Sequence, residues 1–127
     1  MGKNEKKKIL AVLEDLMFTV KINDIARRTG LDVEFVKSEK DVLDKAKHKP
    51  LLIILDLNSN SVQPLKLIHQ LKSHDETKGI SLIGYVSHVQ GELKQKAHDA
   101  GCDMVLARSA FSTNLPMILK RHAGHTF

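Results

Sequence analysis

Four apolar runs of this sequence end in polar residues that could do chemistry. In chain order, these residues are Glu14, Asp15, Asp56, Ser87 and Arg108. Carboxylates held close together repel one another, and a bound divalent cation or a shared proton usually offsets this repulsion. Mg²⁺ takes one or two carboxylates together with phosphate oxygens, and a hydroxyl and an Arg fork suit a phosphoryl group. The residue types therefore predict a site for a cation and a phosphoryl group; the alternative is a set of ordinary solvated turn residues.

The elements that must position these residues follow from the apolar runs. The run "LLIIL" at residues 51–55 is continuously apolar and bounded by polar residues, which favours a strand buried on both faces of a parallel sheet. Similar runs occur at residues 9–13, 33–36, 80–86 and 104–107. Each run is followed by a segment with helical spacing, and strand–helix–strand connections are right-handed. We predict an α/β doubly wound (βα)5 three-layer sandwich, in which the carboxyl ends of five parallel strands share one crevice.

Several residues predict where the helices begin and end. Gly30 is a natural stop for the first helix, because it follows the last apolar position at helical spacing. Ser38 is an N-cap candidate with an acid three residues later, and Pro64 suits the first turn of a third helix. We expect the last helix to begin near Ser112 or Thr113.

Length and composition bound the class of protein. The 127 residues predict a single domain, with 1–6 as a frayed start and 122–127 as a tail. The only cysteine, Cys102, excludes an internal disulfide, and no apolar stretch is of signal-peptide or membrane-spanning type, so we expect a cytoplasmic protein without membrane contact. Lys and Arg are dispersed among acids despite the net charge of +5, so nucleic acid is not an expected partner.

Four segments resemble a known family. They are "KKILAVLED" (7–15), "LLIILDLN" (51–58), "GYVSH" (84–88) and "AGCDMVLARSAF" (100–111). Over about residues 7–121 the chain resembles the receiver domains of bacterial two-component response regulators, including the single-domain chemotaxis type. The resemblance implies the flavodoxin-like receiver fold and a stand-alone signalling domain that is not an enzyme.

The resemblance also implies roles for the strand-end residues. The residue that accepts a phosphoryl group from a histidine kinase or a phosphotransfer protein would be Asp56. The implied Mg²⁺ ligands are Glu14, Asp15, Asp56 and the backbone carbonyl of Asn58. The implied phosphate-binding residues are Ser87 and Arg108. The signal would pass to a downstream protein through the last two helices and the strand between them, around Leu93 to Ile118, or to a second copy in a homodimer.

The sequence departs from the family pattern at four positions. Leu13 stands where one acid of an adjacent pair is usual, and Arg108 and Ser109 replace a lysine and a proline. Val105 replaces the aromatic residue that commonly rotates during switching. These changes resemble those of pseudo-receivers. Three functions therefore stay open: a phosphoacceptor, a phosphorylation-independent pseudo-receiver that binds a protein, and a small-molecule binder or enzyme on the same scaffold.

Overall fold

The computed structural model describes residues 7–87 and 91–124 of the chain; the predicted N-terminal segment 1–6 and the last three residues of the predicted tail lie outside this part. Five parallel strands form one sheet in the order β2-β1-β3-β4-β5. The strands are β1 (Lys7–Val12), β2 (Leu31–Phe35), β3 (Leu52–Asp56), β4 (Ser81–Val86) and β5 (Met104–Ala107). The chain leaves β1 towards β2 on one side and returns to β3 on the other, so the strand order reverses between β1 and β3.

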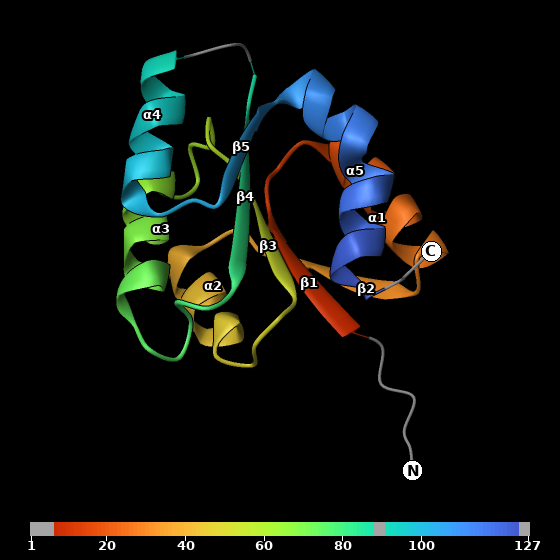
Figure 1. Cartoon of the computed structure of the whole chain (residues 1–127), viewed down its shortest axis with the longest axis horizontal. Helices are drawn as coiled ribbons and strands as arrows, with labels where there is room; N and C mark the ends of the chain where they lie inside the picture. Colours follow the sequence, from red (N-terminus) through yellow and green to blue (C-terminus); the bar gives the residue numbers. More distant parts are fainter. Residues whose placement is uncertain (1–6, 88–90, 125–127) are drawn as a thin grey trace.

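Helices cover both faces of the sheet (Figure 1). One face carries α1 (Leu16–Arg28) and α5 (Arg108–His122), and the other carries α2 (Glu39–Ala46), α3 (Pro64–Ser73) and α4 (Gly91–Ala100). The predicted doubly wound three-layer α/β sandwich is confirmed. Among the described residues, no helix has both the length and the apolar character needed to cross a bilayer.

The core consists of two apolar clusters, one on each face of the sheet. In β1, Leu10 and Val12 face α2, α3 and α4, whereas Ile9 and Ala11 face α1 and α5. The alternation arises because successive side chains of a strand point to opposite faces. Leu13 continues the pattern directly after β1 and belongs to the cluster beneath α1 and α5.

The helix boundaries that depend on local signals are confirmed. The Ser38 hydroxyl accepts the backbone N–H of Asp41 at 3.2 Å and caps α2. Pro64 is the first residue of α3, where a missing N–H costs nothing. Gly30 follows the C-cap of α1 with φ +79°, a left-handed conformation that favours glycine.

The predicted start of the last helix is wrong. α5 begins at Arg108, four residues before Ser112, and Thr113 also lies inside the helix. Its N-cap, Ala107, makes no side-chain capping hydrogen bond, so the local sequence carries no start signal. Burial of Phe111 between α5 and the sheet defines the first turn instead.

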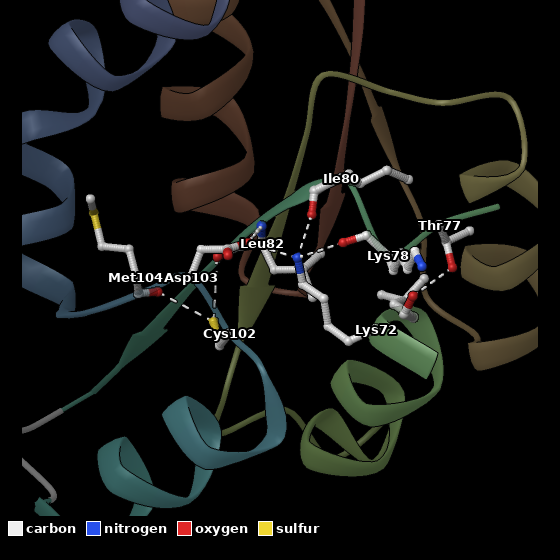
Figure 2. Close-up of polar contacts among 9 residues, drawn as sticks. Lys72, Thr77, Lys78, Ile80, Leu82, Cys102, Asp103 and Met104 are labelled. Carbon is white, nitrogen blue, oxygen red and sulfur yellow. Dashed lines mark hydrogen bonds and ion pairs between the residues drawn. The ribbon is translucent and has the colours of Figure 1, made fainter. Parts of the chain in front are cut away.

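A lysine holds together the edge of the sheet where β4 and β5 begin (Figure 2). The Lys72 ammonium donates to the backbone oxygens of Lys78 and Ile80, at 3.2 and 2.8 Å. Its Nζ also lies 3.0 Å from Oδ2 of Asp103, and the same oxygen accepts the backbone N–H of Leu82 at 2.8 Å. All three donors of the ammonium are used, so α3 and the segments that lead into β4 and β5 are tied at the edge opposite the predicted crevice.

Candidate functional site

The carboxyl ends of the strands bring the predicted site residues to one edge of the sheet. Asp56 is the last residue of β3, and Glu14 and Asp15 follow the neighbouring strand β1. Ser87 follows β4, and Arg108 follows β5 as the first residue of α5. The strand order reverses between β1 and β3, and open α/β sheets bind ligands beyond such a switch point. The structure therefore assembles the predicted residues at the place where a ligand is expected.

Asp56 is a half-buried carboxylate at the centre of this edge. Its Oδ1 accepts the backbone N–H of Asn58 at 2.9 Å, and among the described residues it takes part in no ion pair. Burial raises the pKa of Asp56 above its ordinary value, and the Asn58 N–H and the Arg108 charge offset part of this effect. The charges of Asp15 and Glu14 raise the pKa of Asp56 further, so the three acidic side chains interact electrostatically.

Asn58 joins the ends of β3 and β4. Its backbone N–H donates to Asp56, and its side-chain Oδ1 accepts the backbone N–H of Ser87 at 2.8 Å. Ser87 is exposed at the rim of the site. The two bonds fix the loop after β3 over the carboxylate, which places the Asn58 backbone beside the crevice.

Asp15 and Arg108 form an ion pair across the site. One oxygen of Asp15, Oδ1, accepts the Phe18 backbone N–H at 3.1 Å and caps α1, while the other, Oδ2, contacts the Arg108 guanidinium. The Phe18 N–H and the Arg108 contact together lower the pKa of Asp15. The guanidinium also lies over the Phe18 ring, with Cζ 4.6 Å from the ring centroid. The residue expected to bind a phosphoryl group is therefore paired with a residue expected to bind Mg²⁺.

An aromatic cluster, formed by Phe18, Tyr85 and Phe111, packs against the guanidinium of this ion pair through the Phe18 ring. The Phe18 ring meets Tyr85 edge-on at a centroid distance of 5.0 Å, and Tyr85 stacks on Phe111 at 5.2 Å. Tyr85 is 1% exposed, and its hydroxyl has no hydrogen-bond partner among the described residues. Burial raises the pKa of the Tyr85 hydroxyl well above its ordinary value, so it is neutral at physiological pH.

Sequence reasoning missed the N-cap role of Asp15 and the aromatic cluster. A signal for the cap is present, since Asp is a preferred N-cap and stands directly before the helical apolar pattern that begins at Phe18. No comparable signal exists for the cluster, because Tyr85 and Phe111 come from distant segments and read as ordinary core positions.

Only some of the oxygen donors expected for a divalent cation are present at this edge of the sheet. Leu13, at the position of the missing acid, is 1% exposed within the core, and the Asp15 carboxylate is engaged by Arg108. Within residues 7–87 and 91–124, no three His, Cys, Asp or Glu side chains are grouped so that they could hold a metal ion. The other oxygen donors at this edge of the sheet are the carboxylates of Glu14 and Asp56 and the backbone carbonyl of Asn58. Two carboxylates suffice for Mg²⁺ when phosphate oxygens complete its coordination, so the donors fit a cation that is shared with a phosphoryl group.

Comparisons with known proteins bear on the fold that carries these residues. No protein-family model matches the chain. The chain is 23% identical over 119 residues to the polar-differentiation response regulator DivK of Brucella anthropi, which covers 92% of the chain and 97% of that relative.

Solved structures show the same fold. A putative response regulator from Chloroflexus aurantiacus superposes with a TM-score of 0.81 at 19% identity, covering 95% of this chain and 100% of the other. The receiver domain of the sensor histidine kinase PA1611 from Pseudomonas aeruginosa has a TM-score of 0.78 at 19% identity, with the same coverage of 95% and 100%. That structure has a magnesium ion coordinated in its active-site cleft.

The fold and the site define a doubly wound α/β domain with an acidic crevice at its topological switch point. This is the fold of the response regulator receiver domains, and the chain is similar in sequence to the response regulator DivK over most of its length.

Proposed function

We propose that this chain is a signalling module, not an enzyme, which accepts a phosphoryl group on Asp56 from a histidine kinase or a phosphotransfer protein. The observation that carries the proposal is the half-buried Asp56 carboxylate, which ends β3 at the switch point with one of its oxygens bonded to a backbone N–H. The second oxygen makes no ion pair with the described residues and is available as a nucleophile.

The transfer would proceed by attack of Asp56 Oδ2 on the phosphorus of a phosphohistidine. A P–O bond forms as the P–N bond breaks, the electron pair returns to the imidazole nitrogen, and the imidazole takes up a proton from solvent. A divalent cation held by Glu14, Asp56 and the Asn58 carbonyl would neutralise charge on the phosphoryl oxygens. The Asn58 N–H keeps Oδ1 in place while Oδ2 reacts.

Two further groups would bind the transferred group. Ser87 follows β4 and Arg108 follows β5, the two strands on the side of Asp56 away from β1, and the Arg108 guanidinium extends back to Asp15. A guanidinium fork pairs well with phosphate oxygens. The partner that reads the change would bind the face of α4, β5 and α5 or be a second copy of the chain.

A second candidate is a phosphorylation-independent pseudo-receiver that acts as a protein-interaction module. The observation that favours it is the Asp15–Arg108 ion pair, which engages one expected metal ligand and the expected phosphate-binding residue with each other. The burial of Leu13 at the position of a further acid favours the same function.

The test is an NMR amide titration with Mg²⁺ and then with beryllofluoride, which imitates an aspartyl phosphate. The phosphoacceptor function predicts saturable shifts around Glu14, Asp56 and Ser87, and their loss in Asp56→Asn. An Asp24→Asn variant is the control, because Asp24 is an exposed acid paired with Arg28 on α1, away from the crevice. A spectrum that stays unchanged in the wild-type protein would favour the pseudo-receiver.

A further inference from the structure

Arg108 connects the crevice to helix α1. It is the first residue of α5, yet its two described contacts, the Asp15 carboxylate and the Phe18 ring, both belong to the start of α1. The side chains of Arg108 and Asp15 are 39% and 32% exposed, so water reaches the pair and weakens it. A partly exposed ion pair of this kind can exchange partners at low cost.

Asp56 lies at the same edge of the sheet as this ion pair, because it ends β3, Asp15 follows the neighbouring strand β1, and Arg108 follows β5. Burial raises the pKa of Asp56, and the Arg108 charge offsets part of this effect, in agreement with a guanidinium near this carboxylate. A phosphoryl group adds almost two negative charges and three strong acceptor oxygens. It would therefore compete with the single charge of Asp15 for the same guanidinium.

We propose that Asp15 is a positioning residue that competes with the phosphoryl group on Asp56 for Arg108. The inference rests on the proposed function. In the structure described above, Arg108 is bound to Asp15; when Asp56 carries the group, Arg108 leaves Asp15 and binds the phosphoryl oxygens. The two carboxylate oxygens of Asp15 have separate tasks, so Oδ1 continues to cap α1 after Oδ2 loses the guanidinium.

The exchange would be transmitted to the aromatic cluster. When Arg108 leaves, the face of the Phe18 ring loses its cation, and Phe18 packs directly on Tyr85 and Phe111. The response would thus reach the layer of α1 and α5. Val105, at the position of the usual switching aromatic, belongs to the apolar cluster on the opposite face of the sheet.

The competing role and a metal-binding role for Asp15 predict effects of opposite sign. If Asp15 were a Mg²⁺ ligand, Asp15→Asn would weaken the binding of beryllofluoride in the presence of Mg²⁺. If Asp15 competes for Arg108, the same change strengthens it, because the guanidinium is released. Asn is as good an N-cap as Asp, so the helix start is kept.

The experiment measures the affinity for beryllofluoride at saturating Mg²⁺. Tyr85 is the only tyrosine in a chain without tryptophan, so its intrinsic fluorescence reports on the aromatic cluster without a label. The variants are Asp15→Asn, Arg108→Gln and the double variant, with Asp24→Asn as the control for removal of a negative charge from α1. NMR amide shifts provide a second measure of binding.

We expect Asp15→Asn to bind beryllofluoride about two- to fivefold more tightly, the range for release of a partly exposed ion pair. The gain disappears in the Arg108→Gln background if it acts through the guanidinium, whereas a general charge effect would persist there. Asp24→Asn leaves the affinity unchanged. Asp15→Ser, which also keeps a capping oxygen, should likewise increase the affinity for beryllofluoride.

Three outcomes separate this inference from the proposed function. Wild-type binding with weaker or equal binding by Asp15→Asn would overturn the inference and leave the phosphoacceptor function standing. Binding by Asp15→Asn alone would support the inference, since the ion pair would then block the wild-type site. Absence of binding in all variants would overturn both.

Discussion

Gly84 in β4 offers a sharp test of the packing beneath the crevice. A Cβ at this position would lie 2.8 Å from Cδ1 and 2.9 Å from Cγ of Leu57, where ordinary contacts begin at 3.4 Å. Leu57 follows Asp56 directly, is 4% exposed and belongs to the core cluster on the side of α2, α3 and α4. Its side chain would have to move by several tenths of an ångström within close-packed surroundings.

Gly84→Ala is therefore expected to lower the free energy of unfolding by about 1 to 3 kcal/mol, the usual cost of an overpacked core. Urea denaturation followed by circular dichroism measures the change. Gly79→Ala is the matched control, because a Cβ there meets no atom within 4 Å. Its stability should stay within about 0.5 kcal/mol of the wild type or rise slightly.

A double-mutant cycle identifies the cause. Leu57→Ala removes the atoms that the new methyl group would strike, so adding Gly84→Ala in that background should cost little, although Leu57→Ala is itself destabilising. An equal cost of Gly84→Ala in both backgrounds would refute the steric argument.

Three further predictions concern other parts of the chain. Leu13→Asp should lower the free energy of unfolding by about 3 to 5 kcal/mol, since it places a carboxylate in the core. Leu16→Asp, at a 78% exposed position, is the control. An equal decrease in the free energy of unfolding for both variants, measured by urea denaturation, would contradict the argument. Because the folded state raises the pKa of Asp56, the protonated acid stabilises the fold below about pH 4, and this contribution is lost as the pH rises through the folded pKa. Asp56→Asn should therefore stabilise the protein at pH 7 and have less effect in acid, which a pH series of urea midpoints measures; a destabilised variant at pH 7 would contradict this. Lys72→Met should lower the free energy of unfolding, measured in urea, by about 2 to 3 kcal/mol, because the Asp103 carboxylate and two backbone carbonyls lose the ammonium. Unchanged stability would contradict this and show that water replaces the ammonium.

Much of the fold was predictable because burial leaves a periodic record in the sequence. The continuously apolar run before Asp56 indicated a strand covered on both faces, and the same pattern located the other strands. Local chemistry placed the Ser38 cap and the Pro64 start, since each depends only on neighbouring residues. The start of α5 at Arg108 was not predictable, because packing of Phe111 decides it and no capping side chain marks it.

The sequence by itself determined which residues gather at the crevice, because parallel strands must end at one edge of their sheet. The tertiary structure alone decided how those residues are paired. Asp15 and Arg108 are 93 positions apart, and their contact depends on how α1 and α5 lie side by side. Leu13 faces the core because the alternation of β1 continues into it. Which charged side chains form an ion pair depends on their distance in the folded chain, and a local sequence pattern does not encode that distance.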